Sequence, residues 1–122
     1  MSYESIGKSF VQQYYNAFDV NRANLQMLYR DQSMLTFEGT PCQGPDSIVK
    51  KLMELTFKTI KHIITTTDVQ PTEGGVLVFV IGQLKTDDDP PMTFSEIFHL
   101  RQADPSTYFI FNQIFRLSLH HN

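Results

Sequence analysis

The second half of the chain consists of four runs rich in β-branched and aromatic residues, and short turn segments separate them. The runs span 59–69, 76–84, 92–102 and 107–117. Proline, glycine, aspartate and serine cluster between them, at 71–75, 87–91 and 103–106. A parallel connection needs a dozen or more residues, so these short turns favour antiparallel pairing of successive strands. The pattern therefore predicts a four-stranded antiparallel meander.

The first half of the chain has helical rather than strand periodicity. Apolar residues recur at spacings of three and four, which predicts a helix over about 3–18. A short helix is predicted over 22–29, with Asp19 as its N-cap, although Asp19 could instead point into a cavity between helices and sheet. Gly44-Pro45 predicts the start of a third helix that ends near Leu55. A short strand is expected at 33–37, ended by Gly39.

Both faces of the predicted sheet are apolar. In the run 76–81, three valines alternate with Leu77, Phe79 and Ile81. In the last run, one face should carry Tyr108, Ile110 and Ile114, and the other Phe109, Phe111, Phe115 and Leu117. Three helices can cover only one face of such a sheet, and an uncovered apolar face would be a large exposed patch. We therefore expect a homodimer packed sheet against sheet. The alternative is an outer face that is merely apolar, or one covered by the C-terminal tail.

Composition limits the class of protein. A chain of 122 residues predicts one domain spanning 1–122, with a core large enough to need no cross-links. A net charge of -3 argues against nucleic-acid binding, because phosphate contacts need a net positive field. The chain has one cysteine, no signal-peptide pattern and no apolar run of eighteen residues. We expect an intracellular protein without membrane insertion, in cytoplasm or nucleus.

One turn carries an unusual cluster of charge. Asp87, Asp88 and Asp89 occupy a loop tip that Pro90 and Pro91 stiffen. Adjacent carboxylates repel one another, and no sequence neighbour supplies an offsetting positive group. Such a cluster either stays solvated or awaits a cationic partner. The second interpretation favours recognition over catalysis.

Catalytic and cofactor motifs are missing from the sequence. It has no phosphate-binding Gly-x-x-x-x-Gly-Lys loop, no Gly-x-Ser-x-Gly elbow and no His-Glu-x-x-His zinc pattern, so we expect no cofactor and no metal site. The alternative is a small-molecule enzyme of the dehydratase or isomerase type, with a cavity between helices and sheet. Its acid and base candidates are Asp19, Tyr14 and His62. Nothing in the spacing shows that these three converge.

Residues along nearly the whole chain resemble the nuclear transport factor 2 family. The matching segments are Ile6-Gly7 through Phe10, Tyr14-Tyr15, Phe18-Asp19, Leu35-Thr36-Phe37-Glu38-Gly39, Gln43-Gly44, Ile48-Val49-x-Lys51-Leu52, Gln70-Pro71, Gly82-Gln83-Leu84-Lys85 and Phe115-Arg116-Leu117. The resemblance implies an α+β, cone-shaped, cystatin-like fold in which three helices pack on a curved, mostly antiparallel sheet. It also implies a homodimer that carries the small GTPase Ran, in its GDP form, from cytoplasm to nucleus and concentrates at the nuclear pore.

The resemblance assigns roles to particular residues. Glu38 stands in the family's Thr-Trp-Glu-Gly motif, and Asp87 and Asp89 stand in its acidic loop, so these carboxylates are expected to pair with basic residues of Ran. Phe37 takes the tryptophan position of that motif, beside a cavity that receives a Ran phenylalanine. Tyr3 matches a tryptophan with which the family binds nucleoporin phenylalanine-glycine repeats at the dimer seam.

Two further apolar residues are candidates for the same cavity. Met92 and Phe94 follow the acidic loop and are available to line the opening that the carboxylates border. Such a site would select its partner by charge outside and by shape inside. The chain has no tryptophan, so the aromatic platforms at Phe37 and Tyr3 are smaller than the family's.

Overall fold

The meander predicted for the second half of the chain is present, and it extends into a larger sheet. The computed structural model describes residues 2–118. Its elements are α1 (Tyr3–Val20), the 3-10 helix η1 (Arg22–Leu28), β1 (Tyr29–Phe37), β2 (Thr40–Gln43), α2 (Pro45–Met53), β3 (Ile60–Thr72), β4 (Gly75–Thr86), β5 (Met92–Asp104) and β6 (Thr107–Ser118). The six strands form one sheet in the order β2-β1-β6-β5-β4-β3. All neighbours pair antiparallel except β1 and β6, which are parallel.

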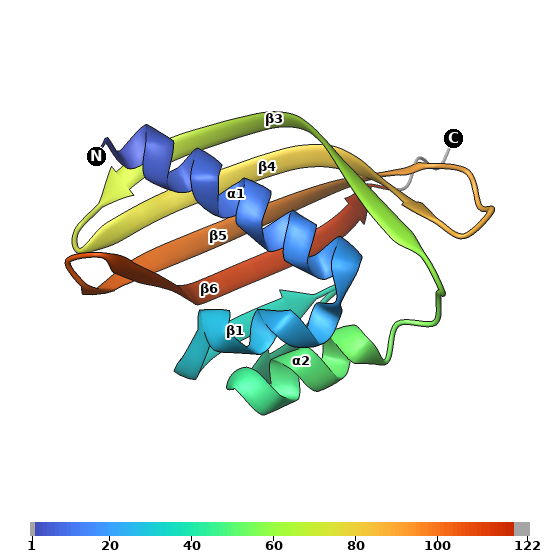
Figure 1. Cartoon of the computed structure of the whole chain (residues 1–122), viewed down its shortest axis with the longest axis horizontal. Helices are drawn as coiled ribbons and strands as arrows, with labels where there is room; N and C mark the ends of the chain where they lie inside the picture. Colours follow the sequence, from blue (N-terminus) through green and yellow to red (C-terminus); the bar gives the residue numbers. More distant parts are fainter. Residues whose placement is uncertain (1, 119–122) are drawn as a thin grey trace.

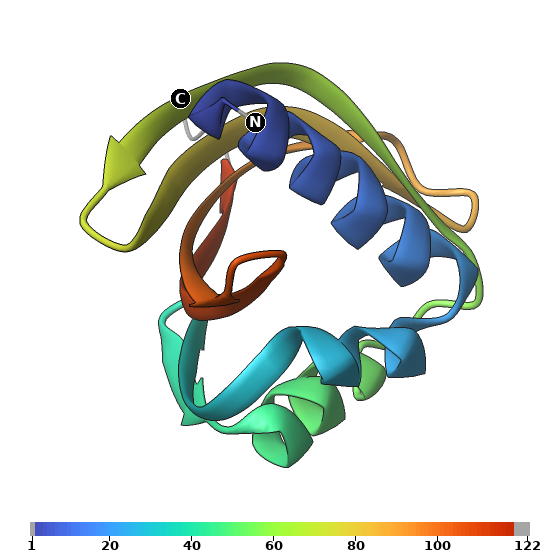
Figure 2. The same cartoon turned by 60° about the vertical axis from the view of Figure 1, so that its left-hand side comes forward.

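This architecture confirms the predicted fold class. Three helical segments pack on a curved, mostly antiparallel sheet; only the short strand β2 was not expected. Figure 2 shows the sheet curving around α1, while η1 and α2 lie beside β1 and close the other side.

Helix α1 lies across the concave face of the sheet, and aromatic packing holds it there. The Ser2 hydroxyl caps its first turn by accepting a hydrogen bond from the Ser5 N–H at 3.2 Å. The rings of Phe10 and Tyr14 meet the ring of Phe98 from β5, with centroids 5.2 and 4.9 Å apart. Each buried aromatic ring contributes a large apolar area, so this contact is a main attachment of helix to sheet.

A bulge in β6 changes the predicted distribution of its side chains. Leu100 pairs with Ile110 and His99 with Asn112, which leaves Phe111 as an extra residue. Ile110 is consequently fully buried in the core, whereas Ile114 is 49% exposed on the outer face. The predicted grouping of Tyr108, Ile110 and Ile114 on one face is therefore wrong. The grouping of Phe109 and Phe111 with Phe115 and Leu117 is wrong for the same reason: only the last two belong to the core cluster.

The outer face of the sheet remains apolar and open within residues 2–118. All helical contacts lie on the concave face or beside β1. Ile63, Phe79, Ile81 and Ile114 are each more than a third exposed on the outer face. The C-terminal tail that could cover them falls at 119–122, outside the described residues. Among the described helices, none has the length and hydropathy of a membrane span.

Candidate functional site

A cavity of about 270 Å³ opens at one end of the molecule, between α1, α2 and the concave face of the sheet. Its wall is mostly aromatic and aliphatic, and its polar groups lie at the mouth or at the deep end. The lining residues are Tyr14, Phe18, Phe37, Leu52, Leu55, Thr56, Phe57, Ile60, His62, Leu84, Thr86, Asp87, Asp89, Met92, Glu96, Phe115 and Leu117. An apolar cavity with a few polar groups is the usual form of a binding site.

Strand register brings the predicted mouth residues to this end. Parallel pairing of β1 with β6 sets Phe37 opposite Phe115, and antiparallel pairing of β5 with β6 sets Phe94 opposite Leu117. The end of β1, the end of β6 and the β4–β5 turn therefore lie at the same end of the sheet, as Figure 1 shows. The end of β1 thus meets the β4–β5 turn, which begins 50 residues later in the chain at Asp87, and the end of β6 around one opening.

Glu38 is held beside the mouth by two hydrogen bonds to β6. Its backbone N–H donates to the Phe115 carbonyl at 3.1 Å, and its Oε1 accepts from the Leu117 N–H at 2.5 Å. Leu117 itself lines the cavity. Glu38 adopts a positive φ of 50°, which turns the chain towards β2. The carboxylate is thus fixed through one oxygen, while the second oxygen has capacity for another partner.

Asp87 is fixed in a similar way by the segment that enters β3. Its Oδ1 accepts hydrogen bonds from the N–H groups of Lys58 and Thr59, at 3.0 and 2.9 Å. The bond from Thr59 is the main cause that lowers the pKa of Asp87 below its usual value. Asp87 also has a positive φ, of 48°. This carboxylate stays ionised at neutral pH and joins the acidic turn to β3.

The acidic turn contains a cation that the sequence analysis did not expect. The Lys85 ammonium donates to the backbone carbonyls of Asp87, at 2.9 Å, and Asp89, at 2.5 Å. Lys85 brings a positive charge to the turn backbone, but among residues 2–118 it forms no ion pair with the three carboxylates. Because Lys85 binds carbonyl oxygens, the carboxylate of Asp89 remains exposed at the mouth.

Of the three apolar residues predicted to line the cavity, two line it and the third packs behind its wall. Phe37 lines the cavity and stacks on Phe115 with centroids 4.7 Å apart and rings nearly parallel. Met92 also lines it. Phe94 requires a correction, since it is fully buried and is not among the lining residues. It packs behind Phe115, centroid to centroid 5.7 Å, and supports the wall. Tyr3 lies in the first turn of α1 and is 40% exposed.

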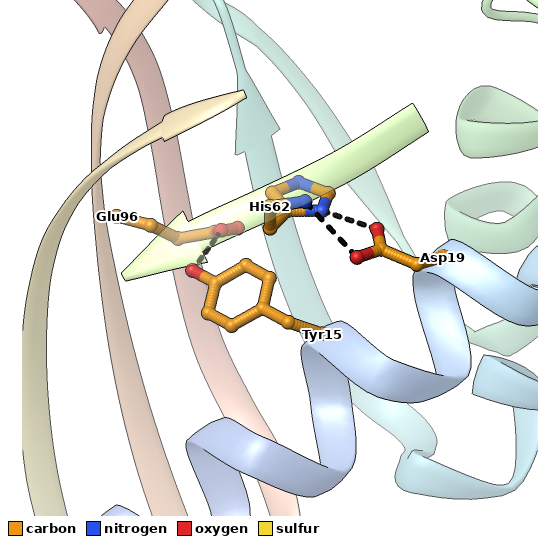
Figure 3. A network of polar contacts seen from close by, with 4 residues as sticks. All are labelled: Tyr15, Asp19, His62 and Glu96. Atoms are coloured by element: carbon orange, nitrogen blue, oxygen red, sulfur yellow. Dashed lines mark hydrogen bonds and ion pairs between the residues drawn. The ribbon is translucent and has the colours of Figure 1, made fainter. Parts of the chain in front are cut away.

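The deep end of the cavity holds a carboxylate that the sequence analysis missed. Glu96 on β5 is 4% exposed, and its Oε1 accepts from the Tyr15 hydroxyl at 2.7 Å (Figure 3). Its Oε2 accepts from the Gln113 side-chain amide at 2.6 Å, and the Gln113 carbonyl accepts from the Tyr29 hydroxyl at 2.7 Å. Burial raises the pKa of Glu96 to about 7, although both hydrogen bonds oppose the rise. A signal was available: Glu96 interrupts an inward alternation that Phe94 and Phe98 otherwise fill.

Of the three acid and base candidates of the enzyme alternative, Asp19 and His62 contact each other. Asp19 accepts from the His62 backbone N–H at 3.0 Å, and its Oδ1 lies 2.6 Å from His62 Nδ1, as Figure 3 shows. Asp19 is therefore not the cap of η1; that cap is Asn21, whose side chain accepts from the Ala23 N–H. Asp19 does not line the cavity either.

Tyr14 does line the cavity, but its hydroxyl is already engaged. It accepts from the Gln113 side-chain amide at 2.8 Å, and burial raises the pKa of the phenol well above its ordinary value. A phenol with a raised pKa holds its proton at neutral pH and is a poor base. Among residues 2–118, no group of three or more histidine, cysteine or acidic side chains could hold a metal ion.

Comparison with known proteins identifies the family. The model of the nuclear transport factor 2 domain matches residues 6–117. The chain belongs to the nuclear transport factor 2 family. Nuclear transport factor 2 of Candida glabrata is 47% identical over 121 residues, which are 97% of this chain and 96% of that protein. The resemblance drawn from the sequence is confirmed.

Solved structures agree with this assignment. Nuclear transport factor 2 from Cryptosporidium parvum superimposes with a TM-score of 0.91 at 44% identity, covering 95% of this chain and 94% of that chain. A Nostoc punctiforme protein of unknown function with a cystatin-like fold has a TM-score of 0.79 at 8% identity, covering 97% of this chain and 93% of that one. The second likeness concerns the fold alone.

The buried carboxylate predicts an unusual dependence of stability on pH. The pKa of Glu96 is about 7 in the folded protein against 4.5 for the ordinary group, so the folded state binds this proton more tightly. Glu96 therefore makes the free energy of unfolding fall as pH rises from about 4.5 to 7, by about 3 kcal/mol. We expect Glu96→Gln to remove this contribution and to unfold at higher urea concentration than the parent at pH 8. Glu54→Gln, at an exposed carboxylate, is the control. An equal change between pH 5 and pH 8 in the parent and in Glu96→Gln would contradict the prediction.

Proposed function

We propose that this chain is a nuclear transport carrier that binds the GDP form of Ran and brings it from cytoplasm to nucleus. The observation that carries the proposal is the apolar cavity with fixed carboxylates at its mouth. The printed names of the relatives, nuclear transport factor 2 in Candida glabrata and in Cryptosporidium parvum, support it. The proposed role is that of a carrier rather than an enzyme, in both cytoplasm and nucleus and concentrated at the nuclear pore.

In the proposed complex the mouth binds cations and the cavity receives an aromatic side chain. Glu38 and Asp87 each use one carboxylate oxygen within the fold, which leaves the other to accept from a lysine or arginine of Ran. Asp89 is exposed beside them. A Ran phenylalanine would then contact Phe37 and Met92 in the wall, with Phe94 supporting the wall from behind. Charge would guide the approach, and shape would select the partner.

A charge reversal at the mouth tests this proposal. We expect Glu38→Lys to weaken binding of Ran-GDP by more than tenfold, because it removes one charge pair and adds repulsion. Calorimetric titration with Ran loaded in turn with GDP and GTP measures both the loss and the nucleotide preference. Asp31→Lys, at the other end of β1, makes the same charge change away from the mouth and is the control. Binding by Glu38→Lys within twofold of the parent would refute the assignment.

We also propose that the carrier is a homodimer packed through the outer faces of two sheets. The open apolar face of Ile63, Phe79, Ile81 and Ile114 supports this, because exposed apolar patches of this kind mark interaction sites. We expect the parent to elute with twice its 14.1 kDa mass in size exclusion with light scattering. Ile114→Arg should give monomers, whereas Val20→Arg, at the exposed end of α1, should not. A monomeric parent at micromolar concentration would exclude the dimer.

Passage through the pore would require contact with nucleoporin repeats, which we assign to Tyr3. Its ring is part-exposed and offers a flat apolar surface for a phenylalanine. Tyr3→Ala should lower the affinity for a synthetic phenylalanine-glycine repeat peptide at least fivefold, whereas Tyr3→Phe keeps the ring and should stay near the parent. Titration followed by amide chemical shifts measures both. Equal affinities for Tyr3→Ala and the parent would remove Tyr3 from the site.

A further inference from the structure

The deep end of the cavity has hydrogen-bonding capacity that the fold does not use. A carboxylate offers about four acceptor positions, and the protein fills one on each oxygen of Glu96, through Tyr15 and Gln113. Glu96 also lines the cavity, so its remaining capacity is available from inside. No lysine or arginine from residues 2–118 pairs with it, since the sole ion pair in that part of the chain joins His62 and Asp19.

The residues that line the cavity include acidic groups but no lysine or arginine. The acidic groups are Glu96 at depth and Asp87 and Asp89 at the mouth. Two cations lie against aromatic rings of the wall: the Arg22 guanidinium is 4.4 Å from the centre of the Phe57 ring, and the Lys51 ammonium is 5.8 Å from the centre of the Phe37 ring. Arg22 also donates to the backbone carbonyls of Leu52 and Leu55, and Lys85 donates to the carbonyls of the acidic turn, so neither pairs with Glu96. An apolar enclosure with acidic groups at both ends favours a cation over an anion.

The volume and the lining of the cavity further limit the kind of ligand that it can hold. A cavity of about 150 Å³ holds one benzene ring, and drug-sized ligands need 300 Å³ or more. At about 270 Å³, this cavity suits one aromatic ring with a short side chain. Phe18, Phe37, Phe57 and Phe115 provide the ring surface in its wall. A ligand that fits this cavity therefore needs one aromatic ring and one strong hydrogen-bond donor at the end of a short side chain.

We propose that the cavity is a binding site for a small arylalkyl amine in its ammonium form. Its ring lies among the phenylalanines, and its ammonium donates to Glu96. The site exists in the protein alone, so it does not depend on the carrier function. It does occupy the space proposed for the aromatic side chain of Ran, and such an amine would therefore compete with that partner.

Binding of the ammonium depends on pH through Glu96. Burial raises the pKa of this carboxyl to about 7, so the acid is mostly neutral at pH 6 and mostly ionised at pH 8. Tyr14 and Tyr15 on α1 and Tyr29 on β1 also face it, and each has a raised pKa and stays neutral throughout this range. The other ionisable groups of the lining are His62 on β3, which is paired with Asp19, and Asp87 and Asp89 at the mouth. Amine affinity should therefore rise about tenfold from pH 6 to pH 8 through Glu96.

Three probes of similar shape test the proposal on the protein without any partner. These are 2-phenylethylamine, 2-phenylethanol and 3-phenylpropionate, each titrated at pH 8 and followed by amide chemical shifts. We expect the amine to bind at least tenfold more tightly than the carboxylate, and more tightly than the alcohol. Shifts should concentrate at the residues that line the cavity. Equal affinity for amine and carboxylate in the parent protein would overturn the proposal, whatever the variants do.

The variant Glu96→Gln identifies the anchor. It keeps the shape of the side chain, and we expect it to lower amine affinity at least tenfold at pH 8 while 2-phenylethanol binds within twofold of the parent. The change of amine affinity with pH should disappear in this variant. If the amine binds Glu96→Gln as tightly as the parent, or if its affinity for this variant still rises with pH, the assignment to Glu96 is overturned. Glu73→Gln, in the turn between β3 and β4, is the control. Failure here leaves the Ran titration of Glu38→Lys unaffected, so the two proposals fail separately.

Discussion

The rest of this structure depends on how one buried carboxylate is accommodated between the long helix and the sheet. Glu96 accepts hydrogen bonds from Tyr15 of α1 and Gln113 of β6, and Gln113 in turn accepts one from Tyr29 of β1. A buried charge without partners would cost several kcal/mol, so these donors must be in place for the fold to close. The network thereby joins α1 to β5, β6 and β1 at the deep end of the cavity. Removing one of these donors would leave a carboxylate oxygen without a hydrogen bond and would weaken the packing at the deep end of the cavity.

The mouth depends on pairing between segments that are distant in sequence. Parallel pairing of β1 with β6 brings Glu38 beside Leu117, and the hydrogen bonds of Asp87 bring the acidic turn against the start of β3. Each of these two carboxylates accepts its hydrogen bonds within the fold through one of its two oxygens. In the proposed complex the same two side chains would also contact the partner, so a substitution at either position would change stability and binding together.

Local patterns predicted most of the elements, and long-range geometry produced the differences. Periodicity located three helices and the four-stranded meander, because amphipathic spacing is a local property. It could not locate the bulge at Phe111, which arises from pairing with β5 and reverses the faces of β6. The hydrogen bonds of Asp19 to His62, and of Lys85 to the acidic turn, likewise depend on tertiary contacts. Glu96 could have been singled out as a charge among inward phenylalanines, but its partners could not.

The acidic turn is rigid before any partner arrives. Pro90 and Pro91 restrict its backbone, Lys85 ties its carbonyls together, and Asp87 anchors it to the residues before β3. Most of its conformational entropy is therefore lost when the chain folds and not when a complex forms. Association then needs little rearrangement, so collisions in the right orientation can succeed at the rate that diffusion and charge attraction set. For the proposed carrier, an acidic turn that is already ordered in the free protein would shorten each round of cargo loading.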